Sequence, residues 1–314
     1  MIRFRTEPVR VRVPATSANL GPGFDSFGLA LCRYDEVRAR ISDSGIRVRV
    51  IGEGAGELAA DESHLVARAL AATFDRLGVR LPGIELTCVN EIPQARGLGS
   101  SSAAIVAGIL AARALVVDGP AVLDEAAVLQ LASDLEGHPD NVAPCLLGGF
   151  TIAWLSGDRP DTARAVRLAP ADGVRPIVLI PTERGLTAHA RAALPAVVPH
   201  ADAARNAARA ALLVHALTTD PALLLPATED WLHQRYRASA APATFALVNE
   251  LRAAGVPAVV SGAGPSVLAF GQPDEIPVTS GWQLLDVGID ARGAVAEVDS
   301  QHAERGTVAA GRAS

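Results

Sequence analysis

The chain has 314 residues, 49% of them hydrophobic but only 4% aromatic, so its core must be built mainly from Ala, Val, Leu and Ile. Its net charge of −6 argues against nonspecific nucleic-acid binding, which needs a basic face or stripe. All 28 residues of the combined Lys and Arg count are arginines, which excludes a Walker A loop, a protein-kinase strand lysine, a Schiff-base lysine and a lysine general base.

Cysteine spacing and the N-terminal segment bear on the compartment. The three cysteines, Cys32, Cys88 and Cys145, are far apart and in no metal-ligand spacing, as expected for reduced thiols in a cytoplasmic protein. The first residues lack the apolar core of a signal peptide. Gly, Arg or Asp interrupts the longest apolar runs, so we expect no membrane span.

The apolar pattern predicts strands and helices in mixed order. In the first half we expect a helix capped by Ser63 that runs towards residue 77, an alanine-rich helix that ends at 115 and a helix at 123–135. The strands expected there are 9–14, 36–40, 46–51 and 84–90. One more strand is expected between the first two of these; it follows a turn-rich segment and ends at residue 31.

In the second half we expect strands at 150–154 and 176–180, helical regions at 201–217, 221–236 and 245–254, and a strand, glycine turn and strand from 259 to 270. This irregular order favours an α+β fold over a regular βαβ array. The polar segment SGDRPDT at 156–162 predicts a domain boundary. A tail that frays is expected after about residue 298.

The first of four candidate site segments is RGLGSSSAA, residues 96–104, between an expected strand and an expected helix. Its glycines let the backbone approach a ligand, and the helix start offers free N–H groups and a dipole that favour an anion. A serine hydroxyl in the first turn can also bind Mg²⁺, which takes oxygen ligands. The segment indicates a lysine-free cradle for a di- or triphosphate, although a tight strand-to-helix turn in a small-residue core has the same pattern.

Three further segments gather polar groups among turn-forming residues. PATSANLGPGFD (14–25) presents Asn19 and Asp25 either to a small polar ligand or to its own backbone, as in an Asx-rich loop. EGHPDN (136–141) places four polar or titratable groups at a helix end, where a metal and substrate site or helix capping would each account for them. SGAGPS (261–266) is either a hairpin turn or a close backbone approach to the first loop.

These segments, in this order, resemble the GHMP kinase superfamily, and SANLGPGFDSFGLAL together with EGHPDNVAP resembles its homoserine kinase family. The resemblance covers nearly the whole chain. It implies an N-terminal mixed-sheet domain with the phosphate loop (1–157), a C-terminal ferredoxin-like domain (158–314) and an active site between them. It also implies phosphoryl transfer from MgATP to the side-chain hydroxyl of L-homoserine, in threonine biosynthesis.

The resemblance also assigns the nucleotide and metal contacts. Ser101 and Glu136 match Mg²⁺ ligands, although Ser102 stands where alanine is usual. His64 lies where many members carry an asparagine at the adenine edge. The residues expected around the ATP phosphates are Pro93, Gln94, Ala95, Arg96, Gly97, Leu98, Gly99, Ser100, Ser101 and Ser102.

For the substrate, the resemblance implies a pocket that matches both charges of an amino acid. Asp25 is expected at the α-ammonium, and Arg191 and Arg237 at the carboxylate, because guanidiniums bind carboxylates in a bidentate manner. Arg235 replaces a usual proline, so the sequence leaves open whether Arg235 or Arg237 points inward. The other substrate contacts expected by resemblance are Asn19, His138 and Asn141.

The catalytic step is expected to proceed without a dedicated base. Asn141 fills a position where some relatives have a catalytic Asp, and an Asn side chain cannot accept a full proton at neutral pH. We therefore expect the hydroxyl to attack the γ-phosphorus directly, with positioning and charge stabilisation supplying the catalysis. Asp140 is the only nearby carboxylate that could act as a base instead.

Two other functions stay open at this stage. One is another superfamily kinase that acts on mevalonate or a related alcohol, and the other is a non-catalytic amino-acid or nucleotide sensor. The charged set of Asp25, Arg191 and Arg237 favours an amino acid, and the metal pair favours an enzyme over a sensor. The resemblance makes a homodimer an expected state, whereas nucleic acid and membrane are not expected partners.

Overall fold

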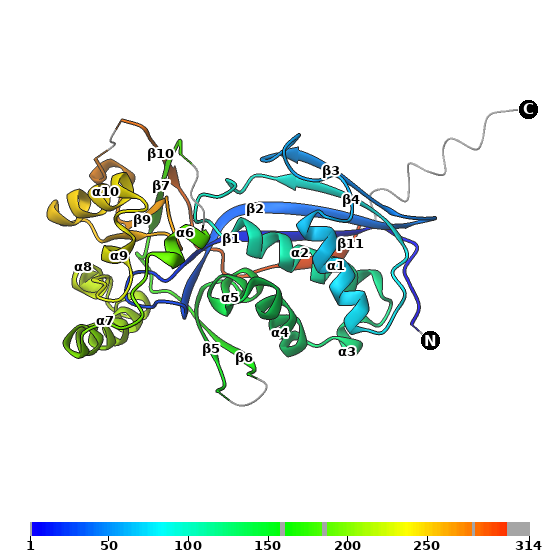
Figure 1. Ribbon diagram of the computed structural model, residues 1–314, viewed down its shortest axis with the longest axis horizontal. Helices are drawn as coiled ribbons and strands as arrows, with labels where there is room; N and C mark the ends of the chain where they lie inside the picture. Colours follow the sequence, from blue (N-terminus) through cyan, green and yellow to red (C-terminus); the bar gives the residue numbers. More distant parts are fainter. Residues whose placement is uncertain (1, 158–160, 184–186, 278–279, 300–314) are drawn as a thin grey trace, which may run out of the picture.

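The computed structural model describes residues 2–157, 161–183, 187–277 and 280–299. A seven-stranded sheet and a four-stranded sheet lie one after the other along the long axis of the molecule (Figure 1). No helix in these ranges is long and apolar enough to cross a bilayer. From residue 300 onward, the tail for which fraying was expected lies outside the described residues.

The seven-stranded sheet is mixed. Its main path has the order β11-β1-β2-β4-β3, and β5 pairs with both β2 and β6. Strands β3 and β4 pair in parallel, and the other described pairs of this sheet are antiparallel. The strands are β1 (Val9–Ala18), β2 (Phe27–Ser42), β3 (Ile46–Gly52), β4 (Gly83–Asn90), β5 (Phe150–Leu155), β6 (Ala163–Leu168) and β11 (Val295–Val298).

Helices cover one face of this sheet, with α2 at their centre (Figure 1). Helix α2 is buried along most of its length, and at Gly108 an added Cβ would lie 2.4 Å from the carbonyl oxygen of Val66. Small residues are therefore required where α1 packs on α2, which explains the alanine-rich composition of this stretch. The helices are α1 (Leu65–Arg76), α2 (Ser100–Leu115), α3 (Gly119–Val122), α4 (Glu125–Glu136) and α5 (Pro139–Leu147).

The four-stranded sheet is antiparallel, with the order β10-β7-β9-β8. Numbered along the chain this is the order 4-1-3-2 of a ferredoxin-like sheet, which confirms the expected α+β fold. Its strands are β7 (Pro176–Pro181), β8 (Ala258–Val260), β9 (Val267–Phe270) and β10 (Trp282–Asp286). The remaining elements are α6 (Thr187–Ala192), α7 (His200–Thr218), η1 (Pro221–Leu223), α8 (Leu224–Ala227), α9 (Gln234–Arg237), α10 (Pro242–Ala253) and η2 (Pro273–Glu275).

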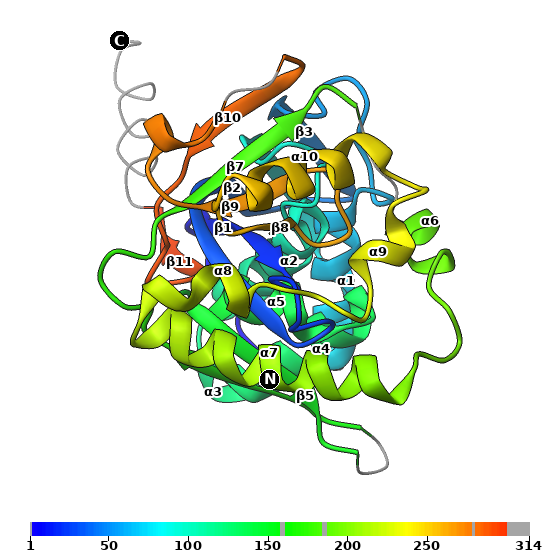
Figure 2. The same cartoon turned by 90° about the vertical axis from the view of Figure 1, so that its left-hand side faces the viewer.

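Alternate residues of β7 serve two different cores. Ile177 and Leu179 pack with the buried face of α10, which lies in front of the sheet in Figure 2. Val178 and Ile180 point the other way and pack in the main hydrophobic core of the molecule. Because successive side chains of a strand face opposite sides, β7 joins the second sheet to the body of the protein.

The domain boundary expected at residues 157 and 158 lies between two paired strands of the first sheet, β5 and β6. It falls inside the hairpin of β5 and β6, whose residues pair from Phe150 with Leu168 to Leu155 with Ala163. The described chain enters the second sheet only at β7, and β11 returns to pair with β1 in the first sheet. The division of the chain into two domains at this point stays a prediction.

Three local predictions were wrong. The two strands expected to end at 31 and to span 36–40 are the single strand β2, because its first part pairs with β5 and its second with β4. The helical region expected at 221–236 is divided into short pieces, where the Asp230 carboxylate accepts N–H groups of the following turn. The cap of α1 is His64, since the Ser63 hydroxyl donates to Asp61 instead.

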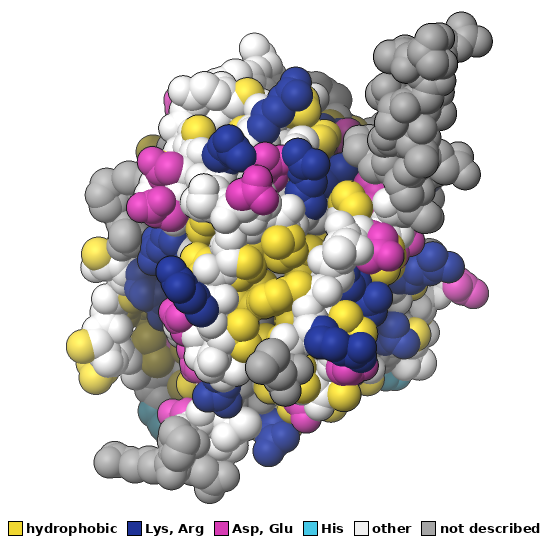
Figure 3. All heavy atoms as spheres, turned by 90° about the vertical axis from the view of Figure 1, so that its right-hand side faces the viewer, with side chains coloured by type: hydrophobic (Ala, Val, Ile, Leu, Met, Phe, Trp, Pro, Cys, Tyr) yellow, Lys and Arg dark blue, Asp and Glu magenta, His cyan; other side chains and the backbone are white. Residues whose placement is uncertain are grey.

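On the face of the first sheet that the helices leave uncovered, here called the outer sheet face, several arginines form ion pairs near the surface. Arg40 and Arg47 both contact Glu85, and Arg10 contacts Glu36 and Glu297. On the face shown in Figure 3, basic and acidic side chains are interspersed around an apolar area. The arginines therefore do not form one continuous basic stripe on that face, and such exposed pairs contribute little to stability.

A buried carboxylate fixes the chain that leaves β4. Asp35, on β2, is only 6% exposed, and its Oδ1 accepts the backbone N–H groups of Glu91 and Ile92 at 2.7 and 2.8 Å. Loss of hydration raises the pKa of Asp35 to about 6, because burial disfavours the charged carboxylate more than the two hydrogen bonds favour it.

We expect Asp35→Asn to stabilise the protein at neutral pH. The Asn oxygen can still accept both N–H groups, and the charge is removed. The pKa of Asp35 in the folded state lies above its value of about 4 in the unfolded state. The buried carboxylate therefore does not destabilise the fold at a pH below the unfolded pKa, and it destabilises the fold fully at a pH above the folded pKa. Urea unfolding should show a gain of roughly 2 kcal/mol at pH 7.5. At pH 4 the gain should vanish, and an equal gain at both pH values would contradict this account.

Candidate active site

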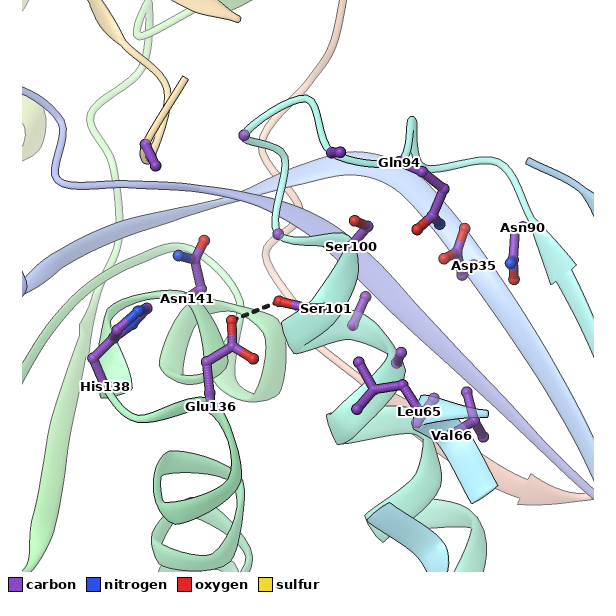
Figure 4. Close-up of a pocket in the computed structure, with 18 of the residues that line it drawn as sticks. Asp35, Leu65, Val66, Asn90, Gln94, Ser100, Ser101, Glu136, His138 and Asn141 are labelled. Atoms are coloured by element: carbon purple, nitrogen blue, oxygen red, sulfur yellow. Dashed lines mark hydrogen bonds between the residues drawn. The ribbon is translucent and has the colours of Figure 1, made fainter. Parts of the chain in front are cut away.

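A cavity of about 490 Å³ lies where the two sheets meet, and segments far apart in the sequence line it. The segment after β1, the start of α2, the junction of α4 and α5, helix α9 and the glycine turn between β8 and β9 all contribute. In Figure 4 three groups of lining residues can be followed: His138 and Asn141, then Glu136 and Ser101, then Leu65, Val66, Asp35 and Asn90. The first group lies on the far side of the Glu136–Ser101 pair from the third.

The phosphate loop expected at residues 93–102 bends sharply into α2. Ala95, Gly97 and Gly99 have φ values of +54°, +72° and +68°, in the left-handed region. Gly99 precedes the first helical residue, Ser100, and no side chain caps this helix end. The first N–H groups of a 16-residue helix therefore face the cavity without a side-chain acceptor, which is a favourable arrangement for an anion.

Two glycines of this loop are required by close contacts. A Cβ at Gly97 would lie 2.3 Å from the carbonyl oxygen of Ser261, in the turn between β8 and β9. A Cβ at Gly99 would lie 2.0 Å from the hydroxyl of Thr16 on β1. The loop is thus clamped between the end of β1 and the glycine turn of the second sheet.

Two serine hydroxyls and a carboxylate meet beside the start of α2. Ser101 and Ser102 donate to the same oxygen of Glu136, Oε1, at 2.6 and 2.9 Å. Ser101 lines the cavity (Figure 4), whereas Ser102 is fully buried and is not among the lining residues. Hydroxyl and carboxylate oxygens suit a hard cation such as Mg²⁺, so this donor set fits the expected metal, with Ser101 as the accessible hydroxyl.

The structure divides the ten expected phosphate contacts. Those that line the cavity are Gln94, Ala95, Gly97, Gly99, Ser100 and Ser101. Of the described residues, Pro93, Arg96, Leu98 and Ser102 lie outside the lining. Arg96 points to the second sheet, where it donates to the carbonyl oxygens of Pro181 and Thr182 at 3.0 and 2.5 Å.

His64 lies at the apolar end of the cavity. It is 5% exposed, and its Nδ1 accepts the N–H of Val66 at 3.2 Å, so its proton resides on Nε2, which has no partner among the residues that the structure describes. Burial lowers the pKa of His64, which keeps the ring neutral. An unpartnered ring N–H in the cavity wall is suited to a base, and the adenine contact remains a prediction.

The acidic and amide groups of α5 are each oriented by a partner. His138 Nδ1 and Asp140 Oδ1 are 2.6 Å apart, and Asp140 is 2% exposed. This hydrogen bond raises the pKa of His138. Asn141 Oδ1 accepts the hydroxyl of Thr16 at 2.8 Å.

The expected ammonium and carboxylate contacts pair with each other in the structure. Arg191 donates to both oxygens of Asp25, at 2.8 and 3.1 Å. Asn19 supports this side of the cavity, because its Oδ1 accepts the N–H of Asp25 and its Nδ2 donates to Gly262 O. Asp25 and Arg191 therefore form an ion pair in the cavity wall.

Arg237 is a buried cation in the cavity wall. It is 6% exposed, and it donates to the carbonyl oxygens of Ala190 and Gly262 at 3.2 and 3.4 Å. No carboxylate among the described residues forms an ion pair with it, and burial lowers its pKa. A buried cation with no carboxylate in direct contact is costly, so this position favours an anionic ligand.

Arg235 takes a different direction. It donates to Asp202 and to the Tyr236 hydroxyl at 2.5 and 2.6 Å, and it is not among the residues that line the cavity. The choice that the sequence left open is settled by the geometry of α9, which turns Arg237 inward. Sequence reasoning missed three other cavity or support residues, Thr16, Asp35 and Asn90, because nothing in their local pattern distinguishes them from ordinary strand residues.

Comparison with known proteins agrees with this geometry. Residues 64–149 match the family model described as GHMP kinases N terminal domain. The chain is 56% identical over 296 residues to a homoserine kinase of Streptomyces avermitilis, which covers 93% of this chain and 96% of that protein. A homoserine kinase of Streptomyces coelicolor is 55% identical, with 93% and 95% covered.

The crystal structure of a homoserine kinase from Cytophaga hutchinsonii superposes with a TM-score of 0.77 at 26% identity and covers 94% of this chain and 99% of that one. Both the sequence likeness and the fold likeness extend over both sheets. The chain therefore belongs to the homoserine kinase family of the GHMP kinases.

Proposed function

We propose that the protein transfers the γ-phosphoryl group of ATP to the side-chain hydroxyl of L-homoserine, with Mg²⁺ bound at Ser101 and Glu136. The observation that carries this proposal is one cavity with two kinds of binding group. The N-terminus of α2, suited to an anion, lies beside the Ser101 hydroxyl and the Glu136 carboxylate, and Asp25, Arg191 and Arg237 lie elsewhere in the wall. The 56% identity to a homoserine kinase supports the same reaction.

The nucleotide end of the cavity accounts for ATP without a lysine. The free N–H groups at the start of α2 and the loop backbone from Gln94 to Gly99 would bind the phosphates. Val66, Leu65 and Leu58 offer apolar surface to the base, beside His64. A bound Mg²⁺ would neutralise charge that develops on the phosphates.

The substrate end matches an amino acid rather than a neutral alcohol. A zwitterion can exchange the Asp25–Arg191 pair for two new pairs, with its ammonium at Asp25 and its carboxylate at Arg191. Arg237 provides a second guanidinium that lacks a carboxylate partner in the described chain. Mevalonate has a carboxylate but no ammonium, so it offers no cation to replace Arg191 at Asp25 and cannot make the two new pairs.

The chain's residues would act mainly by position and charge. Asp140 is committed to His138 at 2.6 Å, so its Oδ1 is not free to accept a proton from the substrate. Asn141 cannot accept a proton at neutral pH. The hydroxyl would then attack the γ-phosphorus directly and lose its proton late, to a phosphoryl oxygen, while the oriented groups stabilise charge.

The substrate assignment predicts the outcome of an ADP-release assay on the wild-type protein. L-Homoserine should stimulate ADP release in the presence of Mg²⁺, and removal of Mg²⁺ should abolish it because the phosphate charge is no longer neutralised. L-Serine, one methylene shorter, and mevalonate should stimulate ADP release far less. Turnover of mevalonate without turnover of homoserine would overturn the proposal, and ATP binding without any turnover would favour a sensor.

The role of Asp140 predicts that Asp140→Asn retains most of its activity. The Asn oxygen can still accept a hydrogen bond from His138, so the geometry is preserved while the basic group is lost. The kcat should stay within about threefold of wild type, whereas loss of a general base costs roughly 10²- to 10⁴-fold. Steady-state kinetics that show a loss of that size would identify Asp140 as the base.

The buried guanidinium predicts a substrate-specific defect in Arg237→Met. The variant keeps an unbranched apolar stem but loses the guanidinium and its charge, so KM for homoserine should rise roughly 10- to 100-fold while KM for ATP changes little. Arg235→Met is the matched control, because Arg235 lies two residues away and points to Asp202. Equal effects of the two substitutions on KM for homoserine would refute the assignment.

A further inference from the structure

Thr16 lies between the phosphate loop and α5, and it is fully buried. Its backbone N–H donates to Leu98 O at 3.1 Å, and its hydroxyl occupies the space that a Cβ at Gly99 would need. The same hydroxyl donates to Asn141 Oδ1 at 2.8 Å. One side chain of β1 therefore contacts both the loop expected to bind phosphate and the amide expected at the reacting hydroxyl.

The hydrogen bond determines which way the Asn141 amide faces. A hydroxyl has one proton to donate, and within the described chain Asn141 Oδ1 is the one acceptor that the Thr16 hydroxyl contacts. Exchanging the oxygen and nitrogen of the amide would leave that buried hydroxyl proton without an acceptor. A buried polar group without a partner costs about 1–3 kcal/mol, so the observed orientation is favoured.

In this orientation Nδ2 is the amide atom left for a ligand. Asn141 lines the cavity, and Figure 4 shows its nitrogen and oxygen pointing apart, on the same side of the Glu136–Ser101 pair as His138. Nδ2 can only donate a hydrogen bond. The amide therefore meets the reacting groups as a donor to oxygen and not as an acceptor of the substrate hydroxyl proton.

We propose that Thr16 is a positioning residue that fixes Asn141 as a hydrogen-bond donor to an oxygen of the reacting groups, either the homoserine hydroxyl or the γ-phosphoryl group. The proposal rests on the proposed kinase function. When the donor contacts the hydroxyl oxygen, the hydroxyl proton is directed away from Asn141 and towards the phosphoryl oxygen. When it contacts the phosphoryl oxygen, it stabilises the charge that develops there.

Thr16→Val tests this role, because valine keeps the branched shape and removes the hydroxyl. We expect kcat with homoserine to fall roughly 10- to 100-fold with little change in KM for ATP, since the amide is no longer held in one orientation. Thr16→Ser restores the hydroxyl and should return kcat to within about threefold of wild type. Thermal unfolding of each variant separates this effect from loss of folded protein.

A double-mutant cycle with Asn141→Ala separates positioning from packing. If Thr16 acts through Asn141, Thr16→Val should cause no further loss of kcat in the Asn141→Ala background. An equal loss in both backgrounds, or a Thr16→Val protein as active as wild type, would overturn the proposal. Should Thr16→Val not fold, Thr16→Cys carries the same cycle, because a thiol is a much weaker donor than a hydroxyl.

Two further readouts complete the experiment. A rise in KM for homoserine in Thr16→Val would place the Asn141 donor at the homoserine hydroxyl. A fall in the rate of slow ATP hydrolysis without homoserine would place it at the phosphoryl group. If neither quantity changes and kcat is unaltered, the positioning role of Thr16 is refuted. The wild-type protein in the same assay tests the kinase function separately. Absence of homoserine-dependent turnover there would overturn both, whereas an active wild type with an additive cycle would overturn the role of Thr16 alone.

Discussion

The structure depends on the contact between the phosphate loop and the glycine turn of the second sheet. The carbonyl oxygens of Ser261 and Gly264 lie so close to Gly97 that a Cβ there would be 2.3 and 2.8 Å from them. The Ser261 hydroxyl lies 2.7 Å from Gly97 O and 2.8 Å from the Ser17 hydroxyl. Close backbone packing of this kind joins the two sheets where the cavity opens between them, so neither sheet alone could form the site.

Charge in this protein is distributed according to burial. Arginines on the outer sheet face are exposed and lie beside glutamates, whereas Arg237 is buried and faces the cavity without a carboxylate partner among the described residues. A chain without lysine has only arginine as a permanent side-chain cation, and its planar guanidinium suits a carboxylate. The backbone N–H groups at the start of α2 provide a positive potential at the cavity, and in the proposed function they would serve the phosphates in place of a lysine.

The polar groups at the reacting end are held before any ligand binds. Glu136 accepts two serine hydroxyls, Asp140 is paired with His138, and Asn141 is held by Thr16. Groups that are fixed in the ground state need little reorganisation when charge develops in the transition state. Such an arrangement agrees with the proposed catalysis by position and electrostatics.

The sequence by itself determined the chemical repertoire: the absence of lysine and the glycine and serine loop before a helix, because these follow from residue type and local motif. The roles expected for Ser101, Glu136, Asp25 and Arg191 came from the family resemblance, and the pairing of Asp25 with Arg191 was not predicted. The sequence also predicted most elements, since apolar periodicity is a local property. It divided β2 in two, because strand pairing joins residues distant in the chain. Only the tertiary structure decided that Arg237 and not Arg235 faces the cavity, that His64 caps α1, and that the Thr16 hydroxyl bonds to Asn141. The first and third depend on contacts between distant segments, and the second depends on competition between neighbouring side chains. No local sequence pattern encodes either of these.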